Sequence, residues 1–336
     1  RLIDPKTNTA VKIVQARDLW FQIIQTRMET GEPYLINIDN CNDALPEEQK
    51  KLGLTIKQSN LCSEITLPTD ENRTAVCCLS SVNLEYFDEW SKEDNFISDL
   101  ITMLDNVLER SIGLGAMGFH SYLQKNNIAF ESMYAASFNN KAFSLIKDRA
   151  DKATRQLGEE RGEAPDMKGS GKRNAHLLAV APNASSSIIC GATSPSIEPN
   201  RANVYTHKTL SGSFKVKNKY LDDILYELVP TGKKREEIWK DIAANEGSVQ
   251  HLDILSDEQK EIFKTAPEIN QIWIIEHAAM RQEYICQSQS VNLFFKSPPI
   301  EADQETHNNF LQYLNDIHWA GIHRLKSLYY LRSNAA

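Results

Sequence analysis

Three side chains with complementary chemistry lie two residues apart in residues 60–64. In an extended segment, side chains alternate with a period of two, so Asn60, Cys62 and Glu64 are expected to point the same way. The amide can donate and accept hydrogen bonds, the carboxylate can move a proton, and the thiol can do sulfur chemistry. A sugar diol is one ligand that could use all three. The alternative is a buried cysteine that acts only as a small hydrophobic side chain.

A second chemical feature is the serine-rich segment of residues 182–187, which follows an apolar run at 176–180. The run predicts a short strand, and the serines predict the start of a helix. Free backbone N–H groups and the helix dipole favour a phosphate at such a position. The alternative is a serine-rich helix cap without a ligand.

Helical and extended patterns alternate along the chain and must position these residues. Apolar spacing of three and four residues predicts helices over 16–30, 96–108, 142–158, 270–282 and 306–330. β-Branched and apolar runs predict extended segments at 34–39, 58–67, 75–84, 176–180 and 290–295. Residues 42–58 are expected to form a loop. A hairpin between the second and third extended segments would bring Cys62 near Cys77 or Cys78.

Three glycines, Gly113, Gly115 and Gly118, lie within nine residues. The spacing is suggestive of a phosphate loop but is weak without a preceding strand. We expect these small residues where a helix packs closely on a neighbour.

The composition limits the class of protein. The chain has 336 residues, 41% of them hydrophobic, and a net charge of −8, which argues against a nucleic-acid partner. It contains no stretch of 18 apolar residues, so no membrane span is expected. Six cysteines, without zinc-type spacing, are too sparse for a secreted disulfide scaffold and favour a reducing cytoplasm. With no internal repeat or linker, we expect a single α/β unit whose strands are separated by helices.

Taken together, five segments of the chain resemble the large, catalytic subunit of class I ribonucleotide reductase. They occur in the family's order and span nearly the whole chain: residues 59–65, 75–84, 112–118, 182–186 with 197–199, and 328–330.

The resemblance implies a ten-stranded α/β barrel made of two parallel five-stranded halves, with a central loop that carries a radical cysteine. Residues 1–336 would be the C-terminal part of this barrel domain, without its N-terminal part or an ATP-binding regulatory domain. Cys62 would be the thiyl radical that takes the 3′ hydrogen of the ribose. Glu64 would accept the 3′-hydroxyl proton, and Asn60 would hold the diol. Cys77, rather than Cys78, matches one member of the reducing cysteine pair.

The same resemblance assigns the two remaining sites. The loop Pro182-Asn183-Ala184-Ser185-Ser186 would bind the substrate's phosphates, chiefly through its last three residues. Tyr329 and Tyr330 match the pair that relays an electron and a proton to the radical cysteine from a separate subunit.

The implied substrate is a ribonucleoside diphosphate, reduced to the deoxyribonucleotide for DNA synthesis. The implied partners are a metal-containing, radical-generating small subunit, a complementing N-terminal piece, a second copy of the complete catalytic subunit, and thioredoxin or glutaredoxin as reductant. No cofactor or metal is expected in this chain, no nucleic acid or membrane is expected as a partner, and the expected location is the cytoplasm.

Three departures from the family accompany this reading. The second redox cysteine and the effector site would lie upstream of Arg1. A connecting segment that the family has between Leu108 and Arg110 is missing, and no cysteine pair precedes the end at Ala336. The alternatives are a non-catalytic fragment that binds the small subunit or nucleotides and regulates another reductase, and a different thiol-radical enzyme on the same barrel.

Overall fold

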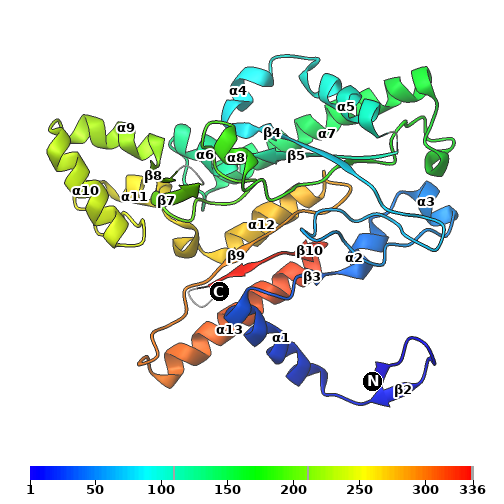
Figure 1. Cartoon of the computed structure of the whole chain (residues 1–336), viewed down its shortest axis with the longest axis horizontal. Helices are drawn as coiled ribbons and strands as arrows, with labels where there is room; N and C mark the ends of the chain where they lie inside the picture. The colour runs from blue at the N-terminus through cyan, green and yellow to red at the C-terminus, as the bar shows by residue number, and fades with distance from the viewer. Residues whose placement is uncertain (109, 210–211, 334–336) are drawn as a thin grey trace.

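The computed structural model describes residues 1–108, 110–209 and 212–333 (Figure 1). Its central sheet has three parallel strands in the order β4 (Cys78–Asn83), β5 (Ser111–Met117) and β6 (His176–Leu178). Parallel neighbours need long crossover connections, which α5 (Phe96–Val107) and α7 (Met133–Arg161) provide. Glu109, where the family resemblance predicts a connecting segment, lies outside the described residues.

The glycine-rich segment forms strand β5, so the prediction of a helix there was wrong. The close approach that the glycines permit is between strands. A Cβ atom at Gly113 would lie 2.5 Å from Leu79 Cδ2 and 3.0 Å from Cys77 Sγ. At Gly115 it would lie 2.4 Å from the Ala179 carbonyl oxygen. Because any side chain would collide with neighbouring segments, these positions need glycine.

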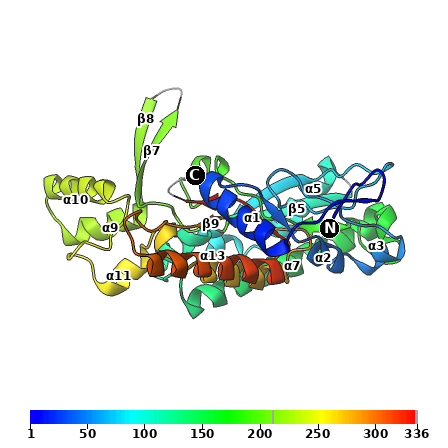
Figure 2. The ribbon, with the colours of Figure 1, turned by 90° about the horizontal axis from the view of Figure 1, so that it is seen from below.

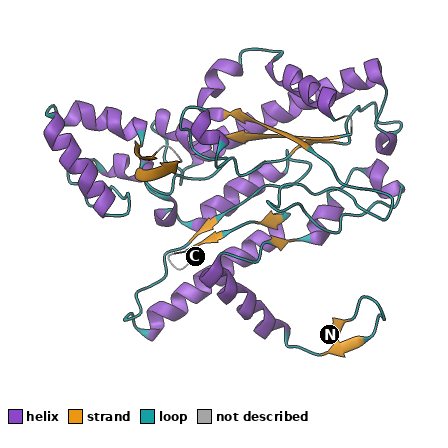
Figure 3. Ribbon diagram, viewed as in Figure 1, coloured by secondary structure: helices purple, strands orange, loops and turns teal. Residues whose placement is uncertain are grey.

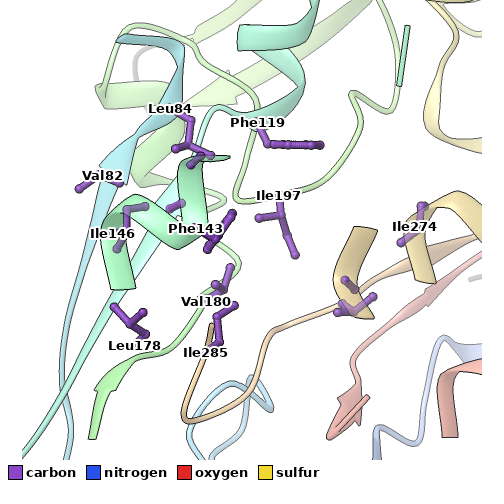
Figure 4. Close-up of a cluster of buried hydrophobic side chains, with 14 of the residues drawn as sticks. Val82, Leu84, Phe119, Phe143, Ile146, Leu178, Val180, Ile197, Ile274 and Ile285 are labelled. Carbon is purple, nitrogen blue, oxygen red and sulfur yellow. The ribbon is translucent and has the colours of Figure 1, made fainter. Parts of the chain in front are cut away.

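The main hydrophobic core lies between the sheet and the helices that cover it. Helix α7 packs against α5 and against α12 (Gln271–Gln282), and α12 packs against α13 (Gln304–Arg324). Figure 4 shows ten labelled members of this core: Val82, Leu84, Phe119, Phe143, Ile146, Leu178, Val180, Ile197, Ile274 and Ile285. Removal of these side chains from water is the main stabilising contribution to the domain.

A second, smaller core belongs to residues 204–263. Its buried side chains come from the start of β7 (Val204–Thr209), from α9 (Lys219–Leu228), α10 (Gly232–Ala244) and α11 (Asp257–Ile262), and from the loop between α10 and α11. Strand β8 (Gly212–Lys217) pairs with β7. The antiparallel pair β7–β8 projects away from the body of the molecule (Figure 2).

The C-terminal segment differs from its prediction. Helix α13 ends at Arg324, whereas the apolar spacing predicted a helix through Tyr330. Leu325 is already extended, and the chain continues as β10 (Ser327–Leu328) and β11 (Leu331–Arg332). Strand β10 pairs with β3 (Leu35–Ile36), and β11 pairs with β9 (Leu293–Phe294). The apolar residues beyond Arg324 therefore reflect buried strands rather than a helical face.

The N-terminal region follows its prediction in part (Figure 3). Helix α1 (Ala16–Thr30) has the predicted bounds. The predicted strand at 34–39 is reduced to β3, and the expected loop at 42–58 contains part of α2 (Ile38–Asp43) and all of α3 (Glu47–Lys51). The remaining elements are short: β1 (Leu2–Ile3), β2 (Ala10–Lys12), η1 (Leu84–Tyr86), α4 (Phe87–Trp90), α6 (Phe119–Lys125), η2 (Pro165–Met167), α8 (Ser186–Ile189) and η3 (Ala266–Glu268). Within the described ranges, no helix has both the length and the apolar character needed to cross a membrane.

Candidate active site

The loop of residues 60–64 is a tight turn, so the prediction of an extended segment with alternating side chains was wrong. The Asn60 N–H donates to the Ile65 carbonyl at 3.2 Å, and the Ile65 N–H donates to Asn60 Oδ1 at 3.0 Å. Ser63 lies in the left-handed region, with a φ of 69°. The Asn60 carboxamide therefore closes the loop that presents Cys62.

The segment before β9 holds this loop from the other side. Ser290 Oγ lies 2.5 Å from the Cys62 carbonyl oxygen and 3.2 Å from Glu64 Oε2. The Ser288 N–H donates to the Glu64 carbonyl at 2.9 Å. Glu64 is only 2% exposed, and the Ser290 hydroxyl is a hydrogen-bond partner of its buried carboxyl group. Nothing in the local sequence of residues 60–64 predicts Ser290, because the contact joins segments more than 200 residues apart.

Of the two predicted tyrosines, Tyr329 contacts Cys62 and Tyr330 lies against Tyr329. The Tyr329 hydroxyl donates to Cys62 Sγ at 3.7 Å, and the ring centres of Tyr329 and Tyr330 are 4.5 Å apart. Burial, together with the hydrogen bond to Cys62, raises the pKa of Tyr329. A phenol that stays protonated next to a thiol is suited to exchange a hydrogen atom with it.

A third tyrosine, Tyr34, was missed by the sequence analysis. Its ring centre lies 4.6 Å from that of Tyr329 and 4.8 Å from that of Tyr330. Its hydroxyl donates to Glu32 Oε1 at 3.1 Å, and burial raises its pKa. Tyr34 reaches this position because β3 pairs with β10. A long-range strand pairing of two residues leaves no recognisable pattern in the sequence.

Cys77 lies just before β4, near the segment that follows the Cys62 loop. It packs against Ile65 and Leu67, although the hairpin expected to bring these segments together does not form. Gln287 Nε2 donates to Cys77 Sγ at 3.4 Å. Burial raises the pKa of Cys77 to about 12, against the opposing effect of Gln287. Cys78 instead begins β4 and packs against the main core, which supports the choice of Cys77.

The serine-rich loop is fixed to the ends of β4 and β5 through Asn183. Asn183 Nδ2 lies 2.9 Å from Ser81 Oγ and 3.2 Å from the Ala116 carbonyl oxygen. Asn183 has a φ of 52°, a conformation that asparagine tolerates better than most residues. Its side chain is occupied by the sheet, so it shapes the loop rather than facing a ligand.

Ala184, Ser185 and Ser186 are exposed. Among the described residues, none accepts a hydrogen bond from the backbone N–H groups of these three. Ser186 begins helix α8, which has only four residues, so free N–H donors matter more here than the helix dipole.

The two loops are joined by one strand pairing. The Val180 N–H donates to the Ser288 carbonyl at 3.1 Å, and the Ser290 N–H donates to the Val180 carbonyl at 2.9 Å. The segment that supports Cys62 and Glu64 therefore pairs directly with the residue that leads into the serine-rich loop. All six cysteines are free thiols.

Comparison with known proteins identifies the family. The ribonucleotide reductase barrel domain matches residues 3–171 and, in a second match, residues 165–331. This chain belongs to the ribonucleotide reductase family. The predicted family and its α/β barrel-domain fold are thereby confirmed.

Individual relatives agree with this reductase assignment. The chain is 49% identical over 353 residues to the ribonucleoside-diphosphate reductase large subunit of Invertebrate iridescent virus 3, covering 99% of this chain and 54% of that protein. It is 47% identical over 360 residues to the putative large subunit of Frog virus 3, covering 99% and 61%. The solved class Id reductase alpha subunit of Actinobacillus ureae superposes with a TM-score of 0.83 at 39% identity, covering 95% and 61%. The chain thus spans between half and two thirds of these relatives.

Proposed function

We propose that this chain is the part of a ribonucleoside-diphosphate reductase catalytic subunit that carries the radical cysteine. The observation that carries the proposal is the contact of Tyr329 with Cys62 at 3.7 Å, backed by Tyr330. An adjacent tyrosine pair that ends on a thiol is an arrangement for moving an electron and a proton together.

In the proposed reaction, the Cys62 thiyl radical removes the 3′ hydrogen of the bound ribose. Glu64 takes the 3′-hydroxyl proton, and the 2′-hydroxyl leaves as water. Two thiols supply two electrons and two protons, so the products are a deoxyribonucleotide, water and a disulfide. Cys77 is one of these thiols, and its raised pKa keeps it in the protonated form that a hydrogen donor needs.

Substrate binding is assigned to two groups of atoms. Asn60 Nδ2 is the donor for the diol, since Asn60 Oδ1 is engaged by the Ile65 N–H. The phosphates are assigned to the loop from Pro182 to Ser186, where free N–H groups and serine hydroxyls point to an anion. Asn183 contributes by holding the loop, which refines the direct contact expected from the resemblance.

The remaining components are proposed from the family. They are a metal-containing small subunit that supplies the radical, an upstream piece with the second redox cysteine, and thioredoxin or glutaredoxin as reductant. We further propose that the complete catalytic subunit is a homodimer in the cytoplasm.

The test is complementation. The chain is mixed with an upstream piece from one of the iridescent virus relatives and the small subunit, and deoxynucleotide formation is assayed. We expect product with the parental chain and with Cys190→Ser, an exposed control, and none with Cys62→Ser. Binding of the small subunit without product in any combination would instead favour a regulatory fragment, and product from Cys62→Ser would exclude the proposed radical site.

A further inference from the structure

Tyr330 differs from Tyr329 in the charge placed on its ring. The guanidinium carbon of Arg332 lies 3.9 Å from the centre of the Tyr330 ring. The backbone around Arg332 is fixed, because its carbonyl accepts a hydrogen bond of 2.8 Å from the Phe295 N–H. The contact between Arg332 and Tyr330 is therefore made by residues whose backbone is held in strand pairing.

A buried carboxyl group is connected to the same tyrosine. Glu198 is 9% exposed, and Asn292 Nδ2 donates to Glu198 Oε1 at 2.6 Å. The other end of this carboxamide accepts a hydrogen bond of 3.0 Å from the Tyr330 N–H. Asn292 thus fixes the position of Glu198 relative to the backbone of Tyr330.

The charges around Glu198 come from two elements. Burial raises the pKa of Glu198 to about 8, while the Asn292 hydrogen bond and the positive charges of Arg332 and Arg201 oppose that rise. Arg201 lies on the same loop as Glu198, and Arg332 lies on β11. Tyr34 also packs against Tyr330, and the Tyr34 hydroxyl donates to the carboxylate of Glu32, which is a further charged group near the pair.

We propose that Arg332 makes Tyr330 harder to oxidise than Tyr329, and that the ionisation of Glu198 controls the strength of this effect. A cation over an aromatic ring is attracted to its electron-rich face. Loss of an electron from the ring weakens this attraction, so Arg332 favours the reduced phenol. The inference rests on the proposed radical relay. It adds a reason why the radical moves from Tyr330 toward Tyr329.

The step concerned is balanced within the chain. A radical on Tyr330, created by the one-electron oxidant of the small subunit, takes a hydrogen atom from the Tyr329 hydroxyl. Tyr330 is reduced to the phenol, and Tyr329 is oxidised to the neutral radical. Tyr329 then takes a hydrogen atom from the Cys62 thiol. Because Arg332 stabilises the reduced form of Tyr330, it drives the radical inward.

Glu198 makes this bias depend on pH. Below about pH 8 the carboxyl group is neutral, and the charge of Arg332 acts on the ring without compensation. Above that value the carboxylate offsets the guanidinium charge, and the inward bias weakens. Glu198→Gln retains an acceptor for Asn292 and removes only the ionisation.

The first experiment needs only this chain. 3-Nitrotyrosine is placed at position 330, and its ionisation is followed by absorbance against pH in the parental chain, Arg332→Met and Arg332→Lys. Arg324→Met is the control, since Arg324 pairs with Glu276 away from this site. We expect Arg332→Met to move the midpoint up by about half a pH unit (about 0.7 kcal/mol), with Arg332→Lys in between and Arg324→Met unchanged. Equal midpoints in folded Arg332→Met and parental chains would overturn the inference.

The second experiment uses the complemented enzyme and separates the two proposals. Tyr330→Phe tests the relay itself: retained turnover would mean that the proposed function fails. If Tyr330→Phe is inactive, the pH profile tests the inference. We expect parental turnover to fall across about pH 8 by a step that is missing in Glu198→Gln. Superimposable profiles would overturn the role of Glu198 while leaving the relay in place.

Discussion

The two loops of the candidate site are both short, yet they are built in opposite ways. We call the Cys62 loop enclosed because its carbonyl groups and the Glu64 carboxyl group are bonded to Ser288 and Ser290, although the Leu61 side chain is 79% exposed. The serine-rich loop is open, with exposed residues and free N–H groups at 184–186. A reactive radical needs a fixed and shielded environment, whereas a phosphate needs unsatisfied donors. The comparison teaches that the hydrogen bonds within each loop match its proposed role. The Cys62 loop has its polar groups bonded, whereas the serine-rich loop keeps N–H groups free for a ligand.

The enclosed loop should be the more sensitive to a change in its chemistry. We expect Glu64→Gln to lower kcat of the complemented enzyme by about 10²- to 10⁴-fold, because it removes a proton acceptor. The amide retains an oxygen for Ser290, so the thermal unfolding transition should stay close to that of the parental chain. Steady-state kinetics measure the effect, and a kcat within threefold of the parental value, allowing about 0.7 kcal/mol, would refute a general-base role.

The two regions also differ in the chemistry of their cysteines. Cys77 packs against Ile65 and Leu67, which follow the enclosed loop, and Cys190 lies exposed just after α8. Since burial raises the pKa of Cys77 to about 12, it stays a protonated thiol at pH 8. Only the thiolate reacts with iodoacetamide, so we expect alkylation of Cys77 to be at least about 100-fold slower than that of Cys190. Mass spectrometry over a pH series reads both sites, and equal rates at pH 8 would contradict this environment for Cys77.

In the open loop, a residue that shapes the backbone should matter more than an exposed hydroxyl. Asn183→Ala removes the contacts with Ser81 and Ala116 and places alanine at a positive φ. We expect a rise in KM of about tenfold, or about 1.4 kcal/mol of binding. Asn183→Gly, which tolerates the φ, should show most of the same rise. Ser185→Ala leaves the N–H donors and is the matched control; a larger effect from Ser185→Ala than from Asn183→Ala would reverse our assignment.

A further effect concerns the stability contributed by the support of the enclosed loop. Ser290→Ala removes the hydroxyl that contacts the Cys62 carbonyl oxygen and Glu64, so we expect the free energy of unfolding to fall by about 1–3 kcal/mol. Ser98→Ala is a control, because the Ser98 hydroxyl bonds at an exposed helix start. Denaturant titration compares the two variants, and equal stabilities would mean that the Ser290 contacts contribute nothing.

The sequence predicted the family and its fold, which the comparisons confirm, but not the geometry of the site. The roles of Cys62, Glu64 and the two tyrosines stay predictions. The turn at Ser63 was not predicted, because its positive φ depends on long-range bonds to the loop. Ser290 and Tyr34 were missed for a related reason, since they reach the site through pairings between distant segments.

Periodicity failed where one pattern fits two structures. The apolar steps through Leu325 and Leu328 fit both a helix and buried strands, and the extended backbone at Leu325 favoured the strands. The glycines at 113 and 115 likewise suit close helix packing or a crowded strand. Only the neighbours on β4 and after β6 distinguish the two.

The central claim is that Cys62 receives its radical through Tyr329. The most direct measurement is deoxynucleotide formation by the complemented enzyme with Tyr329→Phe, which removes the hydroxyl that donates to the Cys62 sulfur. We predict no product, with substrate binding unchanged from the parental complex. Product formation at the parental rate would contradict the account.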